Sequence, residues 1–114
     1  MAYHAGLSAE ATISNAYEMR GLPIAECRWR GVAGEIDLIA RDGEAVVFVE
    51  VKQSRSFDRA VARITPRQMS RVYATAEEFL ATEPRGSLTE VRFDVALVNG
   101  LGEVRIIENA FGHG

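Results

Sequence analysis

The chain has 114 residues, of which 47% are apolar and 25% are charged, and its formal net charge is −3. These values are typical of one small soluble domain, residues 1–114, and they exclude a disordered or fibrous chain. No apolar run reaches the roughly 18 residues of a membrane helix, and the first residues lack the pattern of a secretory signal. Because Cys27 is the only cysteine and the only histidines are His4 and His113, we expect no disulfide, no histidine-based zinc site and a cytoplasmic location.

The first half of the chain predicts one helix followed by three strands. Residues 6–20 form a helical pattern that ends before Gly21, and Glu10 lies in the middle of its inward-facing stripe. Asp42 and Gly43 form a strong signal for a two-residue hairpin turn between the second and third strands. The three predicted strands span 22–30, 34–41 and 44–52.

The second half predicts one helix and two strands. Residues 53–64 are less regular. Thr65, Pro66 and Gln68 then mark the start of a helix, because threonine is a good N-cap, proline suits the first position and glutamine completes a capping box. The last two predicted strands span 90–98 and 103–108. The whole order, helix, three strands, helix, two strands, indicates an α/β fold in which helices flank a mixed central sheet.

Charge is distributed unevenly along the chain. Residues 52–71 carry six basic residues and one acid, a net charge of +5, which leaves −8 for the rest. Such a stretch is either a solvated surface or a local contact with an anion such as nucleic acid. Lys52 is the only lysine of the chain. The candidate nucleic-acid-binding residues recur at every fourth position: Arg55, Arg59, Arg63, Arg67 and Arg71.

Acidic residues of the second and third strands fall on one face. The predicted turn pairs Asp37 with Phe48 and Glu35 with Glu50. Glu50 and Lys52 share this face at the end of an apolar run typical of a buried strand. Like charges in such a place are costly unless a divalent cation, or more weakly an ion pair with a basic residue, compensates for them. The pattern therefore favours a metal site over a plain polar surface.

Two segments, GEIDLIA at 34–40 and VFVEVK at 47–52, resemble the signature of the YraN-like family of bacterial proteins. That family belongs to the PD-(D/E)XK nuclease superfamily and is similar to archaeal Holliday-junction resolvases. The similarity extends over nearly the whole chain. It implies a restriction-endonuclease-like core with an active site where two central strands diverge.

Carried over by position, the resemblance implies a binding site for Mg²⁺ or Mn²⁺. Asp37, Glu50 and the backbone carbonyl of Val51 would be the ligands, and Glu10 would reach the ion directly or through water. Lys52 would orient or activate the attacking water, or stabilise charge on the phosphate. Gln68 would be an auxiliary catalytic residue.

Purely structural roles remain open for Glu10, Glu35 and Gln68. Glu10 could pair with Arg28 or Lys52 instead of a metal. Glu35 could act near the site or simply form a salt bridge. The capping box explains Gln68 without any catalytic role.

These features together predict a metal-dependent endonuclease that acts on DNA, with structured or junction DNA as the substrate that the resemblance implies. A resolvase would need two active sites and therefore a homodimer. We expect no membrane and no small-molecule cofactor. The alternatives are a non-catalytic nucleic-acid-binding or assembly module that keeps the fold, and a purely structural interaction protein.

Overall fold

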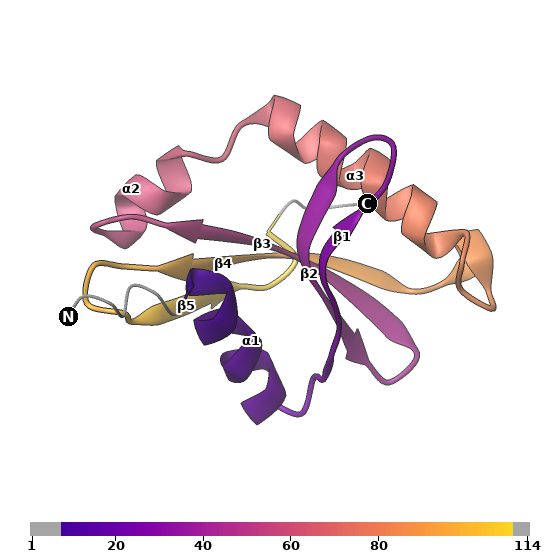
Figure 1. Ribbon diagram of the computed structural model, residues 1–114, viewed down its shortest axis with the longest axis horizontal. Helices are drawn as coiled ribbons and strands as arrows, with labels where there is room; N and C mark the ends of the chain where they lie inside the picture. Colours follow the sequence, from indigo (N-terminus) through magenta and orange to yellow (C-terminus); the bar gives the residue numbers. More distant parts are fainter. Residues whose placement is uncertain (1–7, 111–114) are drawn as a thin grey trace.

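The structure, a computed structural model, describes residues 8–110. A single five-stranded sheet carries helices on its faces (Figure 1). The elements are α1 (Ala9–Met19), β1 (Ile24–Arg30), β2 (Glu35–Asp42), β3 (Ala45–Gln53), α2 (Phe57–Ala62), α3 (Pro66–Leu80), the 3₁₀-helix η2 (Gly86–Leu88), β4 (Val91–Val98) and β5 (Val104–Ile107). The predicted fold class, a mixed central sheet flanked by helices, is confirmed.

The strands of the sheet follow their order in the chain, from β1 to β5. The first three form an antiparallel meander, and β4 then runs parallel to β3 before β5 returns antiparallel. A parallel neighbour requires a crossover, which α2 and α3 provide. The third strand is therefore central and covered on both faces, which explains its nearly continuous run of buried residues.

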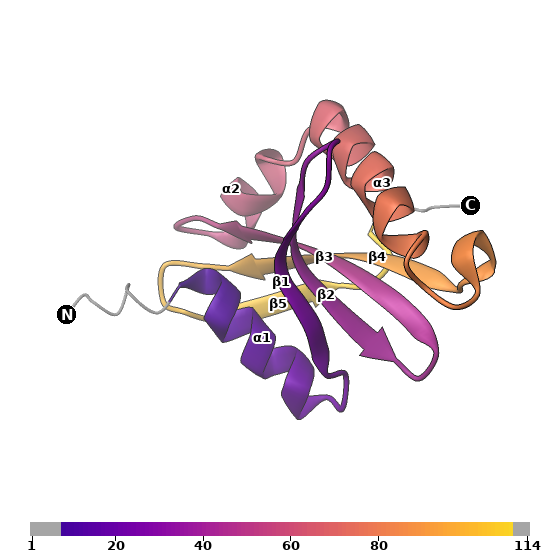
Figure 2. The ribbon, with the colours of Figure 1, turned by 45° about the vertical axis from the view of Figure 1, so that its right-hand side comes forward.

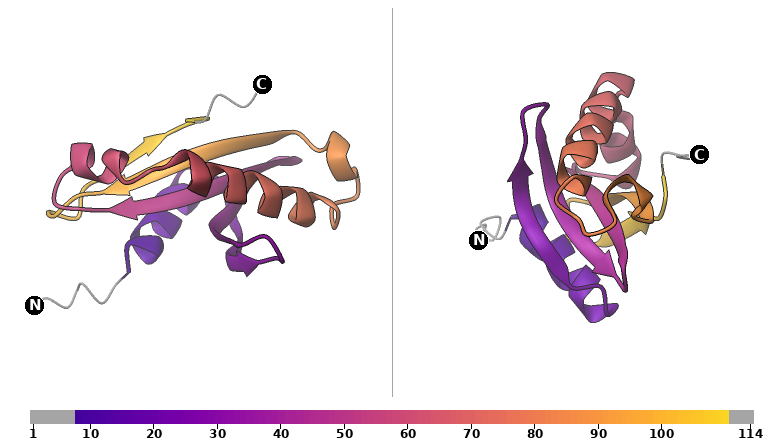
Figure 3. Two further views of the ribbon diagram at one scale, coloured as in Figure 1. Left: turned by 90° about the horizontal axis from the view of Figure 1, so that it is seen from above. Right: turned by 90° about the vertical axis from the view of Figure 1, so that its right-hand side faces the viewer.

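Helices pack on the two faces of the sheet through separate apolar clusters. Ile13 and Tyr17 of α1 are fully buried on one face. On the other face Phe79 of α3 packs against Phe48, and Ala60 of α2 packs further along β4. Figure 3 shows α1 and α3 on opposite sides of the sheet. Within residues 8–110, no helix has the length and apolar character needed to cross a membrane.

Capping side chains set the starts of the helices. The predicted capping box at Thr65 is confirmed for its first half, because Thr65 Oγ1 accepts a hydrogen bond from the Gln68 amide at 3.2 Å. Within the described residues the first helix starts at Ala9, with Ser8 as its N-cap. Residues 6 and 7 of the predicted helix lie outside the described residues.

The segment 53–64, predicted to be irregular, contains α2. Ser56 caps this helix by accepting a hydrogen bond from the Arg59 amide at 3.2 Å. The helix has only six residues, too few for apolar spacing to reveal it.

The hairpin between β2 and β3 turns one residue later than predicted. Asp42 pairs with Ala45, so Gly43 and Glu44 form the turn and the paired numbers sum to 87 rather than 85. Gly43 has a φ of +62°, and glycine at the first position of a two-residue turn is typical of type II′. The prediction of Asp42 as a turn residue is therefore wrong.

The later turn also corrects the predicted cross-strand pairs. Phe48 lies opposite Ile39 rather than Asp37, and the predicted pairing of Glu35 with Glu50 is wrong. Because every partner moves by two positions, each side chain keeps its face of the sheet. One further step of the observed register would bring Asp37 opposite Glu50.

Candidate functional site

Strands β2 and β3 separate partway along their length. Their last pair is Leu38 with Val49, whereas β3 stays paired with β4 as far as Gln53, and β2 stays paired with β1 as far as Glu35. Beyond Leu38 the β1–β2 hairpin leaves β3 and lies against α3 (Figures 1 and 2). We refer to the place of separation, with Asp37 on one side and residues 50–52 on the other, as the fork.

Asp37 occupies the fork from the β2 side. Its Oδ2 accepts a hydrogen bond from the backbone amide of Val51 at 2.7 Å, where a continuing ladder would offer a backbone carbonyl. Burial raises the pKa of Asp37, and the Glu10 carboxylate adds to the rise, while the Val51 amide and the Lys52 ammonium oppose it. The Asp37 carboxyl is thus partly removed from water, which makes its ionised form less favourable.

Glu50 occupies the fork from the β3 side and is only 7% exposed. Its Oε2 accepts a hydrogen bond from Gln68 Nε2 at 2.7 Å and lies 3.8 Å from Lys52 Nζ. Its Oε1 is buried and accepts no hydrogen bond from a donor of the described residues, although the Asp37 carboxyl is close enough to share a proton with Glu50. Burial, followed by the nearby Asp37 carboxylate, raises the pKa of Glu50 to about 7. A buried oxygen without a partner costs free energy, so Glu50 Oε1 is suited to an external ligand.

Lys52 and Gln68 complete the α3 side of the fork. The Lys52 side chain is 14% exposed and forms its ion pair with Glu50. Gln68 stands in the first turn of α3, where its backbone amide donates to the Thr65 cap and its side-chain Nε2 donates to Glu50 Oε2.

Glu10 is turned toward Arg28 rather than Lys52. Arg28 Nε lies 2.8 Å from Glu10 Oε1, which is one of the plain roles left open for Glu10. Both side chains line a pocket of about 400 Å³ that Asp37 and Val51 also line. The pocket therefore joins Glu10 of α1 to the fork.

Glu35 lies apart from this group. It pairs with Arg30, 3.1 Å away, within the β1–β2 hairpin. Within residues 8–110, no three His, Cys, Asp or Glu side chains form a ready-made metal cluster. Asp37 and Glu50 meet at the fork, whereas Glu10 approaches it while bound to Arg28.

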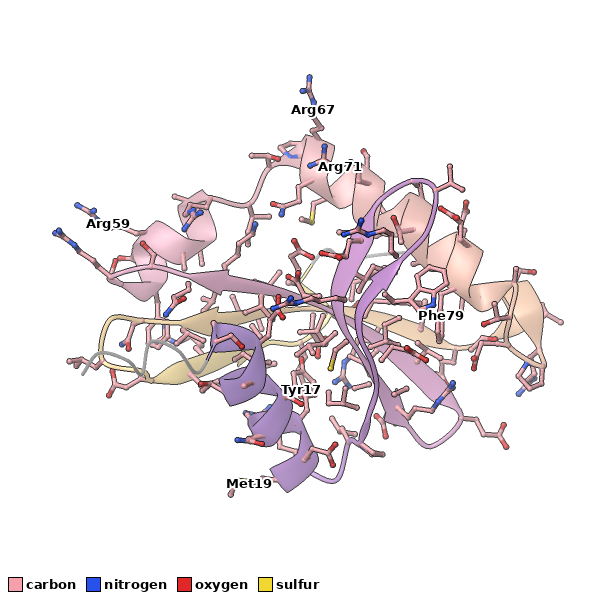
Figure 4. The ribbon with its side chains drawn as sticks, in the orientation of Figure 1. Tyr17, Met19, Arg59, Arg67, Arg71 and Phe79 are labelled. Atoms are coloured by element: carbon pink, nitrogen blue, oxygen red, sulfur yellow. The ribbon has the colours of Figure 1, made fainter. Side chains whose placement is uncertain are left out.

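The arginines of the basic stretch are all exposed. They come from three places: the loop before α2, α2 itself with its C-cap, and α3. Arg59 and Arg67 point outward from their helices (Figure 4). Arg63 differs from the others because its Nη1 donates to the Gln53 carbonyl at 2.9 Å. The arginine residues are Arg55, Arg59, Arg63, Arg67 and Arg71.

The sequence predicts only part of the surroundings of Arg28. The sequence suggested it as a partner of Glu10 but not that it stands beside Asp37. Pairing of β1 with β2 places Arg28 opposite Asp37, between two paired positions. A register for the first hairpin would have indicated this, but the long 31–34 loop offers no two-residue turn from which to count.

The fold and the fork define an α/β protein whose five-stranded mixed sheet is compatible with a nuclease-like core. Residues 9–98 match the family described as Uncharacterised protein family UPF0102, and the chain belongs to this family, which confirms the YraN-like resemblance.

Relatives of this family align along almost the full length of the chain. A UPF0102 protein of Cereibacter sphaeroides is 59% identical over 111 residues, 97% of this chain and 95% of that protein. One of Roseobacter denitrificans is 58% identical over 114 residues, 100% of this chain and 88% of that protein. One of Ruegeria pomeroyi is 60% identical over 110 residues, 96% of this chain and 89% of that protein.

Proposed function

We propose that the protein is a metal-dependent endonuclease that hydrolyses phosphodiester bonds in DNA. The observation that carries this proposal is the fork. Two carboxyl groups with raised pKa values, Asp37 and Glu50, stand there beside the only lysine of the chain. Perturbed acids grouped with a cation are typical of catalytic sites.

The groups at the fork fit Mg²⁺ or Mn²⁺. Both cations prefer oxygen ligands, and Asp37, Glu50 and the Val51 carbonyl supply only oxygen. A cation would give the unpartnered Glu50 Oε1 a partner and would offset the repulsion between the two carboxylates. We therefore assign these three residues as ligands, with Glu10 as a fourth once it leaves Arg28.

The chemistry divides between the ion and the side chains around it. When bound, the ion supplies charge stabilisation for the phosphate and activation of water. Lys52 places its ammonium 3.8 Å from Glu50 Oε2, close enough to orient the attacking water or to stabilise charge on the phosphate. Gln68 holds Glu50 Oε2 by a hydrogen bond, which leaves Oε1 for the ion.

The exposed arginines bind the phosphate backbone of the DNA. Residues 52–71 have a net charge of +5 in an otherwise acidic chain, so the attraction to phosphates is local. Structured or junction DNA is the substrate class that the family resemblance implies. A junction resolvase would act as a homodimer in the cytoplasm, and both features belong to this proposal.

A second candidate function is a non-catalytic nucleic-acid-binding or assembly module. The Glu10–Arg28 ion pair favours it, because an arginine already neutralises the carboxylate that would join a metal site. This alternative predicts DNA binding that is insensitive to Mn²⁺ and is not followed by cleavage.

A cleavage panel distinguishes the two functions. Linear, single-stranded, flap and four-way-junction DNA are incubated with the protein and either Mn²⁺ or EDTA. We expect Mn²⁺-dependent cleavage of at least one substrate, and loss of cleavage by about 100-fold or more in Lys52→Ala and in Asp37→Ala.

The matched control for Lys52→Ala is Arg85→Ala, which also removes one positive charge, but at a 65% exposed position whose only ion pair within residues 8–110 is with Glu44. It should cleave like the wild type, and circular dichroism should show all variants folded. Equal behaviour of the wild type and Lys52→Ala on every substrate would contradict the endonuclease proposal.

A further inference from the structure

Three adjacent strands bring three charged residues to one level of the sheet. Arg28 of β1 stands opposite Asp37 of β2, and one step beyond the last β2–β3 pair brings Asp37 to Glu50 of β3. Arg28 is therefore part of the surroundings of the fork, although the family resemblance assigns it no role.

The backbone of Arg28 is strained. Its φ is +52°, in the left-handed region that side chains other than glycine and asparagine rarely adopt. Such a conformation is unfavourable for a residue with a Cβ atom and is concentrated at functional sites. Among the described residues other than glycine only Asn109, at +49°, shares it, and asparagine tolerates it better than arginine.

Most N–H donors of the Arg28 guanidinium have no hydrogen-bond partner among the described residues. It carries five N–H groups, of which only Nε bonds a described residue, Glu10 at 2.8 Å. The Arg28 side chain is 63% exposed, whereas that of Glu10 is 26% exposed. Because Arg28 lines the same pocket as Asp37 and Val51, its remaining donors can reach a ligand that enters there.

We propose that Arg28 is a phosphate-contacting residue of the fork, held by Glu10 until a divalent cation binds. This inference rests on the proposed function. The cation and the guanidinium compete for the Glu10 carboxylate, and when the cation takes it, Arg28 turns its donors to a phosphate oxygen of the nucleic acid. Guanidinium groups suit this contact because their planar donors match two phosphate oxygens at once.

The exchange has two thermodynamic consequences. Removing Arg28 leaves Glu10 free, so the metal alone should bind more tightly. At the same time the metal and the nucleic acid should lose part of their mutual support, namely the part that the released guanidinium adds to the direct attraction between the ion and the phosphate.

The first test measures Mn²⁺ binding to the full chain, without DNA, by isothermal titration calorimetry. The variants are Arg28→Asn, which removes the charge and suits the left-handed backbone, and Arg30→Asn as a matched control. Arg30 is 78% exposed and forms the neighbouring ion pair with Glu35. We expect Arg28→Asn to bind Mn²⁺ about three- to fivefold more tightly than wild type, and Arg30→Asn to bind it within about 1.5-fold.

The second test measures the affinity for a short DNA duplex by fluorescence anisotropy, with Ca²⁺ or EDTA. Ca²⁺ accepts the same oxygen ligands in a looser geometry. We expect Ca²⁺ to raise the affinity of the wild type about fivefold or more, to raise that of Arg28→Asn by a clearly smaller factor, and to retain most of its effect on Arg28→Lys.

The outcomes separate this inference from the proposed function. If wild type binds Mn²⁺ while Arg28→Asn binds it equally or more weakly, Arg28 only anchors Glu10, and the inference is wrong while the proposed function stands. If Ca²⁺ strengthens DNA binding by Arg28→Asn as much as binding by the wild type, the phosphate contact is wrong. If the wild type binds no Mn²⁺, both proposals are overturned.

Discussion

Glu50 is a buried acid whose ionisation opposes folding. Its ordinary pKa is 4.5, and burial followed by the charge of Asp37 raises it to about 7 in the folded protein. Between these two values the unfolded chain loses the proton while the folded chain keeps it. The folded state then binds more protons, so the free energy of unfolding falls as the pH rises from about 4.5 to 7.

The variant Glu50→Gln tests this linkage, because glutamine resembles the protonated acid at every pH. In EDTA, we expect its free energy of unfolding, relative to wild type, to rise by about 1–3 kcal/mol between pH 4 and pH 8. Urea denaturation at the two pH values measures it. The control is Glu44→Gln, at an 89% exposed turn position, which should show no such change. A Glu50→Gln effect that is equal at both pH values would contradict the raised pKa.

The side chains at the fork differ in how far the sequence predicts them. Alternation along an apolar strand is sufficient to place Glu50 and Lys52 on one face, because every second side chain points the same way. The ion pair of Glu10 with Arg28 and the left-handed backbone of Arg28 are not predictable in this way, since both depend on how the β1–β2 hairpin twists over the sheet.

At the scale of elements, the buried carboxylate of Asp94 anchors α1 to the sheet. Asp94 of β4 is fully buried and accepts a hydrogen bond from the Tyr17 hydroxyl at 2.7 Å. Arg92 donates to both of its oxygens at 2.9 and 3.0 Å, and the Asn109 amide donates at 2.9 Å. Since α1 carries Glu10, this network also helps to position Glu10 beside the fork.

Two variants measure how much this hydrogen-bond network contributes to the free energy of unfolding. Tyr17→Phe removes one hydrogen bond and keeps the packing, so we expect the free energy of unfolding to fall by about 1–2 kcal/mol. Asp94→Ala leaves Arg92 without its main partner and should cost about 3–5 kcal/mol. Urea denaturation at pH 7 measures both. No cost for Tyr17→Phe would show that the hydroxyl contact carries little stability, and equal costs for the two variants would contradict the larger share assigned to the Asp94–Arg92 pair.

Local signals explain why some elements are predictable and others are not. The start of α3 follows from Thr65 and Pro66, whose preferences act within one turn of helix. The turn after β2 is ambiguous, because Gly43 suits either central position of a two-residue turn. Choosing the wrong position shifts every β2–β3 pair by two, which is why the faces of these strands are predictable and their partners are not.

Over the whole molecule, charge is segregated. The +5 segment forms α2 and the start of α3 along one side of a body that measures 44 × 29 × 23 Å, whereas the remaining chain carries −8. Electrostatic attraction should therefore guide DNA to one side of the molecule, with the fork beside it. The strength of this attraction depends on how many phosphates the arginines neutralise.

The salt dependence of the DNA affinity reports how many phosphates the protein contacts. We expect the DNA affinity of the wild type to fall steeply between 50 and 200 mM salt, and Arg67→Ala to reduce the slope of log K against log salt by about 1. Arg67 suits this test because it is exposed, points away from the sheet and has no ion pair within the described residues (Figure 4).

The matched control is Arg85→Ala, which removes the same charge from the loop after α3, where Arg85 lies 3.7 Å from Glu44 of the β2–β3 turn. Fluorescence anisotropy with a short duplex at four salt concentrations, in EDTA, measures both slopes. Because EDTA excludes any contribution from a bound cation, a slope that changes equally in the two variants would mean that DNA does not lie along α2 and α3.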